Sequence, residues 1–180
     1  MKRALFALAL AAALPMSAQA AERSYSFVEF DYVNVNNDAD GFAVRGSVNF
    51  GESNFYGLGS YTNVEVDNTS INVEGYEAGI GFHHTLSDSA DFIAEVAYQN
   101  VEVAGFDAEG YRVSGGFRGD FSDNVEALVK LNYLDGDNVD GDFTATVGAQ
   151  YKFSETWGVT GEVEIADGGQ NYLVGVRASF

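Results

Sequence analysis

Apolar and polar residues alternate at every second position through long parts of the chain. The clearest stretch runs from Phe143 to Phe153, where apolar side chains occupy every odd-numbered position. The same pattern recurs in residues 42–50, 92–99, 111–121 and 171–180. Strict alternation predicts β-strands with one apolar and one polar face, and none of these stretches has the periodicity of a helix.

Two kinds of connector separate the strands. Four are short, resemble one another and recur every 32 to 36 residues, at 50–55, 86–92, 121–125 and 153–157. Five are acidic and rich in Gly and Asn, at 34–41, 66–70, 104–110, 135–142 and 166–171. Tight turns that alternate with longer loops indicate a hairpin repeat. Nine connectors predict ten strands, with eight as the alternative count, at roughly 24–33, 42–50, 55–65, 71–84, 92–103, 110–121, 125–134, 142–153, 157–165 and 171–180.

The apolar strand faces could meet either the core of a soluble β-sandwich or membrane lipid, since both produce alternation. Aromatic residues gather at both ends of the strands, for example Phe121 and Trp157 near the tight turns and Tyr61 and Tyr133 near the acidic loops. Two aromatic girdles around a band of small and aliphatic residues are typical of a lipid-facing barrel wall. Strands of this length also cross a bilayer when tilted. We therefore predict an all-β fold, a transmembrane antiparallel up-and-down β-barrel with both termini in the periplasm, and keep the secreted sandwich as the alternative.

The first 20 residues have the pattern of a cleaved secretory signal peptide. Lys2 and Arg3 precede an apolar run, and Ala18-Gln19-Ala20 matches a signal peptidase site. The run is too short to cross a bilayer as a helix, although an uncleaved anchor is the alternative. We expect residues 1–20 to be removed and residues 21–180 to form one barrel domain. The expected location is the outer membrane, with outer-membrane vesicles as a further location.

Composition narrows the possible partners. Removing Lys2 and Arg3 from the 9 basic residues leaves 7 against 27 acidic ones, a net charge of −20. Such a charge argues against nucleic acid as a partner. The chain has no cysteine, and its one proline is Pro15, so the predicted barrel has no proline to interrupt a backbone ladder.

The remaining cations lie on the polar parity of the strands, apart from Arg23. Acids share that parity, among them Glu29, Asp31, Asp120, Glu126 and Glu164. In a closed barrel this parity faces the lumen, where buried carboxylates need cationic partners. We predict a lumenal charge network of Arg45, Glu77, Glu95, Arg112, Arg118, Lys130, Lys152, Glu162 and Arg177. We also expect Gly57, Gly59, Gly79, Gly81, Gly116 and Gly148 to face inward and leave space, and no stretch long enough to form a plug.

The last ten residues resemble the terminal strand signature of bacterial outer-membrane proteins. The apolar positions that carry this resemblance are Tyr172, Val174, Val176, Ala178 and Phe180. The resemblance implies that the outer-membrane assembly machinery reads this segment, and that the segment closes the barrel onto the first strand.

Other phrases extend the resemblance to the whole chain. With the signal region and the terminal Phe, "VAYQNVEVAGFDAEGYRVSGGFR" and "KFSETWGVTGEV" resemble the small outer-membrane β-barrels of xanthomonad bacteria. That family was named for a proposed role in triggering rice immunity. The resemblance implies an outer-membrane or vesicle-associated barrel. It brings no catalytic signature, and the signalling role does not follow from these residues.

Two features invite a chemical role. His83 and His84 are adjacent at the tight-turn end of a strand, so alternation points His83 inward and His84 toward lipid. Barrel enzymes generally place a histidine at the outer rim instead. The acids of 135–142 and the run of Asn36, Asp38, Asp40 and Gly41 suggest calcium. The run resembles the opening of an EF-hand loop, but Ser47 stands where its bidentate Glu is needed. We therefore expect no enzymatic activity, no cofactor and no dedicated metal site, with a hydrolase and a calcium site as alternatives.

Together these patterns predict a structural or surface-interaction barrel with a polar, salt-bridged lumen. The alternative is a narrow, cation-preferring pore, since ten strands lie between the filled interior of eight and the aqueous channel of sixteen. The expected partners are outer-membrane lipid, lipopolysaccharide and the assembly machinery.

Overall fold

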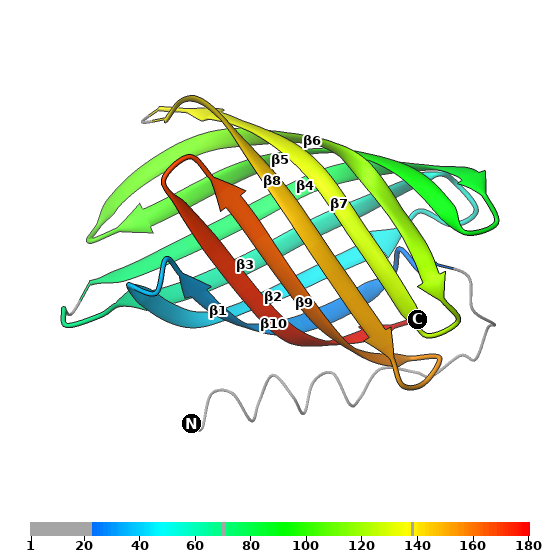
Figure 1. Ribbon diagram of the computed structural model, residues 1–180. Helices are drawn as coiled ribbons and strands as arrows, with labels where there is room; N and C mark the ends of the chain where they lie inside the picture. The colour runs from blue at the N-terminus through cyan, green and yellow to red at the C-terminus, as the bar shows by residue number, and fades with distance from the viewer. Residues whose placement is uncertain (1–22, 70, 138) are drawn as a thin grey trace.

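The chain forms a barrel of antiparallel strands, seen from the side in Figure 1. The computed structural model describes residues 23–69, 71–137 and 139–180, so the predicted signal peptide lies outside the described residues. Within those ranges no helix is long and apolar enough to cross a membrane. The strands are β1 (Phe27–Val35), β2 (Ala39–Asn49), β3 (Phe55–Val66), β4 (Asn72–Ser87), β5 (Ala90–Val103), β6 (Phe106–Ser122), β7 (Val125–Gly136), β8 (Val139–Lys152), β9 (Trp157–Ala166) and β10 (Gly169–Ser179).

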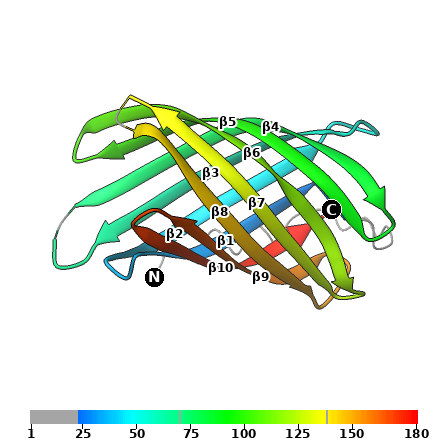
Figure 2. The ribbon, with the colours of Figure 1, turned by 45° about the horizontal axis from the view of Figure 1, so that its top comes forward.

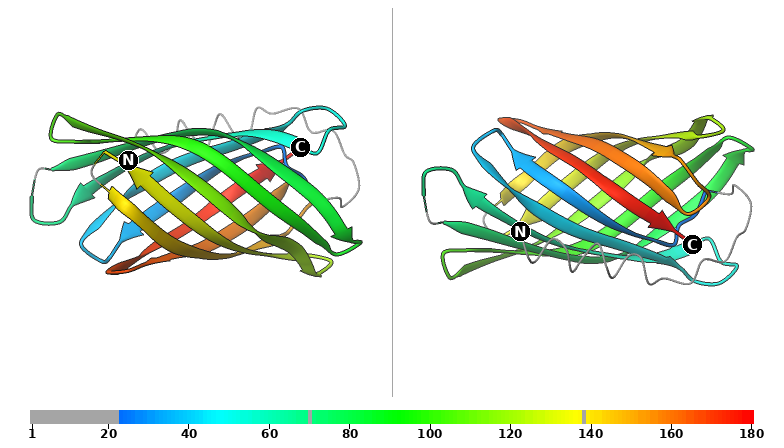
Figure 3. Two further views of the ribbon diagram at one scale, coloured as in Figure 1. Left: turned by 90° about the horizontal axis from the view of Figure 1, so that it is seen from above. Right: turned by 90° about the horizontal axis from the view of Figure 1, so that it is seen from below.

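Each strand pairs with its neighbours in the chain, and β10 closes the barrel on β1. The closing ladder runs from Phe27 opposite Ser179 to Val35 opposite Asn171. Figures 2 and 3 show the strands inclined to the long axis on every side of the barrel. The predicted ten-stranded up-and-down barrel is confirmed, and the sandwich alternative is wrong.

Four of the five connectors that we predicted as acidic loops are mostly strand, which corrects the sequence analysis. β6 begins at Phe106, inside the predicted loop, and only Ala104 and Gly105 separate it from β5. Both residues have positive φ, 52° and 84°, as a two-residue hairpin turn requires. The alternation of side chains continues through this region, so the ladder also continues, up to Val103 opposite Phe106.

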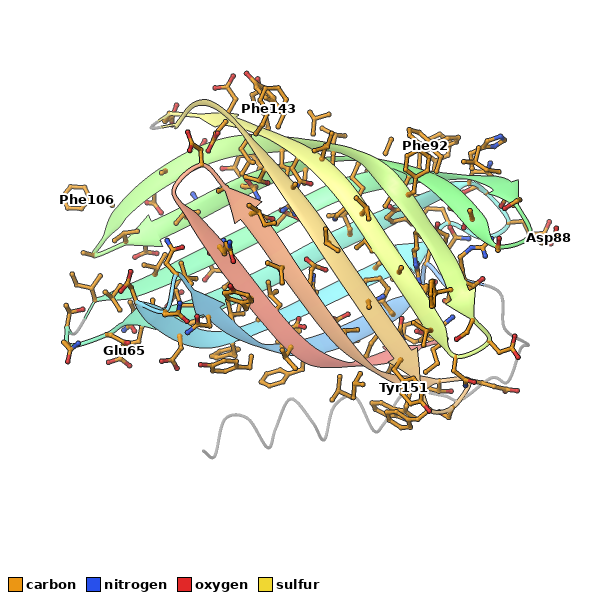
Figure 4. The ribbon with its side chains drawn as sticks, viewed as in Figure 1. Glu65, Asp88, Phe92, Phe106, Phe143 and Tyr151 are labelled. Atoms are coloured by element: carbon orange, nitrogen blue, oxygen red, sulfur yellow. The ribbon has the colours of Figure 1, made fainter. Side chains whose placement is uncertain are left out.

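The outer face of the barrel is apolar and the inner face is polar. Side chains exposed on the outside include Ile80, Val96, Val113, Val129, Leu131, Val147, Val159 and Val174. Figure 4 shows Phe92, Phe143 and Tyr151 projecting away from the wall. Buried polar side chains include Glu29, Asp31, Asp91, Arg118, Glu126, Asn132, Thr146 and Thr160. A water-soluble protein has the opposite arrangement, so this wall is built for a lipid solvent.

Aromatic side chains pair across neighbouring strands at both ends of the apolar band. Toward the acidic turns, ring centroids lie 5.1 Å apart in both Tyr61–Tyr76 and Tyr133–Phe143. Toward the other end, the centroid distances are 5.2 Å for Phe55–Phe82 and 5.8 Å for Phe92–Phe117. The structure thus places two aromatic girdles on the outside of the barrel, where tyrosine and phenylalanine suit the membrane interfaces.

Gly57 and Gly59 face outward, contrary to our prediction. Tyr56 beside them points into the lumen and is only 3% exposed. A Cβ at Gly57 would lie 3.1 Å from the Phe50 ring on the outside. This strand begins with Phe55 and Tyr56, one aromatic residue on each parity, so the alternation did not define which face was inward.

The inner face becomes apolar at the end of the barrel that carries the acidic turns. Val33, Ala39, Ala43 and Val64 form a buried cluster there. Val35, Val66, Val73 and Leu173 pack against it. The sequence analysis assigned a polar inner face to the whole barrel, so this apolar patch is a further correction. Apolar side chains at a lumen mouth oppose the entry of ions and water.

Candidate functional site

Arg45 on β2 is the centre of the largest ion-pair cluster in the lumen. Its Nε lies 2.9 Å from Asp31 Oδ2, and its Nη2 lies 2.6 Å from Glu29 Oε1. Its Nη1 reaches Glu162 on β9 at 3.1 Å. Glu29 and Asp31 are both 0% exposed. Buried carboxylates of this kind are tolerated only with charged, hydrogen-bonded partners, and Arg45 is such a partner for both.

The register of the closing strands explains why Glu29 can be buried. Arg45 stands directly opposite Glu29 on β2, and Arg177 stands directly opposite it on β10. The Arg177 guanidinium pairs with Glu29, and the Thr160 hydroxyl donates to Glu29 Oε1 at 2.8 Å. The seam between the first and last strands therefore has a row of alternating charges on its inner side.

Arg112 on β6 ties opposite walls of the barrel together. Its guanidinium pairs with Glu77 on β4, and its Nη1 lies 3.7 Å from Glu164 Oε2 on β9. In the ring of ten strands, β4 and β9 are five strands apart in either direction. A contact between them has to cross the bore, so Arg112 obstructs the lumen at this level.

The other predicted lumenal residues form two smaller clusters. Lys130 Nζ lies 3.0 Å from Glu95 Oε2. Glu126 is shared by the Arg118 guanidinium and by Lys152 Nζ, the latter at 3.0 Å. The structure therefore places all nine residues of the predicted charge network in lumenal ion pairs. With Arg23, every Lys and Arg of the described residues is paired.

A small chamber lies inside the lumen among these ion pairs. Its volume is about 100 Å³, and Tyr25, Arg45, Glu95, Arg118, Lys130 and Glu162 are among its lining residues. The Tyr56 hydroxyl donates to Glu95 Oε1 at 2.8 Å in the same region. The chamber has room for a few water molecules and too little room for a sugar.

The segment before β1 enters the lumen at the end with the tight turns, although we expected no stretch to act as a plug. Tyr25 is 6% exposed, and its hydroxyl donates to Asp91 Oδ2 at 2.9 Å. Burial raises the pKa of this phenol above its usual value. Hydrogen bonding to Asp91 likewise raises the pKa of Arg23. Arg23, Tyr25 and Asp91 belong to the lumenal site, and the sequence analysis did not predict them.

The two histidines point in opposite directions. His83 faces inward, and its ring stacks on Tyr25 with centroids 4.0 Å apart. His84 is exposed and lies 6.5 Å from the ring of Phe82 on the outer face. Over the described ranges, no group of three or more His, Asp or Glu side chains is arranged to hold a metal ion. The ring contacts of His83 with Tyr25 and of His84 with Phe82 are aromatic packing at the tight-turn end.

The predicted assembly signal lies on the outer side of β10. Tyr172, Val174 and Phe180 are exposed by 38%, 62% and 42%, and Val176 is half-buried. Ala178 is only 1% exposed and stands opposite Trp157 in the ladder with β9. The Phe180 amide donates to the Ser26 carbonyl at 3.0 Å, which extends the closing seam beyond β10.

Of the comparisons with known proteins, the one with solved structures supports the fold. No protein-family profile and no curated protein matches the chain. Among solved structures, the KdgM porin in complex with disordered oligogalacturonate is similar with a TM-score of 0.59 and 18% identity, over 86% of this chain and 99% of that one. The NanC porin is similar with a TM-score of 0.56 and 8% identity, over 86% and 99% of the two chains. At these identities the likeness establishes a porin-like barrel fold.

Proposed function

We propose that this protein is an outer-membrane barrel whose lumen is held closed by ion pairs, and that it has a structural or surface-interaction role. The observation that carries the proposal is the bridge from Glu77 through Arg112 to Glu164, which joins opposite walls. A solute channel of the same size would leave its bore free of such a bridge. The apolar exterior and the aromatic girdles support a location in the outer membrane.

The lumenal charges argue against uptake of acidic sugars. The KdgM structure was determined with oligogalacturonate, an anionic oligosaccharide. Here the ion pairs join seven cations to nine carboxylates, a balance of 7 − 9 = −2. Among the residues that the structure describes, no lumenal cation is left over to attract an anion, and the excess of carboxylates repels one.

The same excess of carboxylates favours the second candidate, a narrow pore that prefers cations. In that case the ion pairs would rearrange as small cations pass. We place this candidate second because the Glu77–Arg112–Glu164 bridge crosses the bore, and the apolar cluster at Val33 and Val64 opposes the entry of ions.

The remaining roles concern the surroundings of the barrel. We propose outer-membrane lipid and lipopolysaccharide as contacts of the girdles and acidic turns, and the assembly machinery as a partner of β10. Membership of the xanthomonad-type barrel family, with release in vesicles, is part of the same proposal. It is supported by the strand phrases and the barrel fold.

Liposome swelling tests the closed lumen against a solute pore. Liposomes that contain the refolded protein and a trapped polysaccharide are diluted into isotonic solutions of small neutral sugars. We expect no more swelling than in protein-free liposomes, because the bore is bridged. A general porin in parallel liposomes verifies the assay, and rapid swelling with verified barrels of this protein would overturn the proposal.

A further inference from the structure

We propose that residues Arg23–Tyr25 are a removable plug, which seals the tight-turn end of the lumen and opens the inner chamber to the periplasm when it withdraws. This goes beyond a closed lumen, because it assigns closure at one end to a segment that is separate from the wall. Three observations carry the proposal: the anchoring of the plug, its position between two cavities, and its independence from the strand ladder.

Arg23 anchors the segment to the rim of the barrel. Its Nε and Nη2 donate to the two oxygens of Asp91 at 3.0 and 3.1 Å. Its Nη1 donates to Asp120 Oδ2 at 2.5 Å and to the Asp88 carbonyl at 3.0 Å. A guanidinium that donates to both oxygens of a carboxylate is fixed in its orientation as well as bound.

Tyr25 fills the bore behind this anchor. Its ring stacks on His83 at 4.0 Å and on Tyr56 at 4.9 Å, between centroids. The Arg118 guanidinium lies 4.8 Å from the Tyr25 ring centroid, and Arg118 also donates to the Ser24 carbonyl at 2.9 Å. Rings and cations that surround a phenol in this way form a binding site that is specific for it.

The plug separates two cavities. On the inner side is the chamber of about 100 Å³, and on the outer side is a vestibule of about 840 Å³. Tyr25 and Arg118 line both cavities. Arg23, Ser24 and Ser26 line only the vestibule, so the Tyr25 ring is the main partition between the two spaces.

Withdrawal of the plug leaves the wall intact. The ladders of β1 with β2 and with β10 begin at Phe27, after the plug. Residues 23–25 are held by side-chain contacts and by the Ser47 hydroxyl, which donates to the Tyr25 carbonyl at 2.7 Å. Local segments held in this way open at lower free energy than the ladders of the barrel.

Cysteine labelling tests the plug cleanly, because the chain has no cysteine. Leu128 lines the chamber, and no polar side-chain contact is lost when it becomes Cys. The rate of modification of Leu128→Cys by a trimethylammonium methanethiosulfonate is compared in the native background and with Arg23→Ala and Tyr25→Ala combined. We expect labelling about tenfold faster without the plug, since loss of anchoring contacts raises the open population.

Two controls make the result decisive. Ser154→Cys lies in the vestibule and should be labelled at the same rate in both backgrounds. Tyr25→Phe keeps the ring and loses only the hydrogen bond to Asp91, so its labelling rate should stay near that of the native background. Migration of unboiled samples verifies that each variant is a folded barrel. Equal rates at Leu128→Cys in folded barrels with and without the plug would refute the proposal.

Discussion

Arg112 Nη1 on β6 lies 3.7 Å from Glu164 Oε2 on β9, across the bore of the barrel. Because Glu77 on β4 holds the same guanidinium, one side chain connects strands on opposite sides of the ring. A barrel of this size can leave an open path only if such contacts are absent or transient. The account of this protein as a closed barrel depends chiefly on this contact.

Trp157, the only tryptophan, should report the depth of the tight-turn girdle. It faces outward at the start of β9, next to the inward-facing Gly158. We expect its fluorescence to be quenched more by lipids that are spin-labelled near the headgroup than by lipids labelled near the chain end. Trp157→Phe combined with Val147→Trp moves the reporter to the middle of the apolar band and should reverse that order. Absence of quenching in both proteins would contradict a lipid-facing wall.

Phe180→Ser should lower the amount of assembled protein in the outer membrane. The prediction follows from the resemblance of β10 to terminal strands and from the exposed position of Phe180. Outer-membrane fractions are compared for barrels whose gel migration changes on boiling. Phe121→Ser is the matched control, because Phe121 is 86% exposed at the same end but lies within the chain. Equal losses in both variants would show that the position at the end of β10 has no special role.

Arg45→Met should destabilise the barrel strongly. Glu29 and Asp31 would remain buried without their main partner, and the expected loss is about 3–5 kcal/mol. Urea-induced unfolding in lipid vesicles measures the change. Lys152→Met is the control, since Glu126 keeps Arg118, and it should cost about 0–1 kcal/mol. A loss for Arg45→Met as small as that of the control would mean that the lumenal cluster contributes little to stability.

Two neighbouring glycines test the packing of the wall. A Cβ at Gly116 would lie 2.0 Å from the Val129 carbonyl oxygen, whereas at Gly115 it would have no neighbour within 4 Å. Gly116→Ala should therefore cost about 1–3 kcal/mol, because the backbone has to move. Gly115→Ala should change the stability by less than about 0.5 kcal/mol. The same unfolding assay checks both, and similar effects at the two sites would show that the register of β6 against β7 is wrong.

The sequence defined the fold well because a barrel wall repeats one simple pattern. Alternation predicted strand cores such as residues 143–152 on β8 and 171–179 on β10, and the spacing of the connectors predicted the number of strands. The errors lay where alternation was ambiguous or where composition was misleading. Phe55 and Tyr56 gave β3 two possible phases, and the acidic, Gly-rich sequence at 104–110 has a loop composition although most of it pairs as strand.

The lumenal site was predicted in part. Parity alone selected side chains such as Arg45, Glu95 and Arg177, since these charged residues lie on the polar parity of their strands, which faces inward. The pairing partners were not predictable, because they depend on contacts across the bore. The plug was missed because the first strand was predicted at 24–33, which includes Tyr25, whereas β1 begins at Phe27. Arg23 binds Asp91, a residue 68 positions away, so this contact was not predictable from the sequence.

Single-channel conductance of the refolded protein in a planar bilayer, with a salt gradient across the membrane, tests the closed lumen most directly. Gel migration first establishes that the inserted protein is a folded barrel. We predict a silent bilayer for the native protein, because the Glu77–Arg112–Glu164 bridge crosses the bore. Discrete, cation-selective current steps that shrink when Glu95 or Glu162 is replaced by Gln would contradict the account and establish a narrow pore.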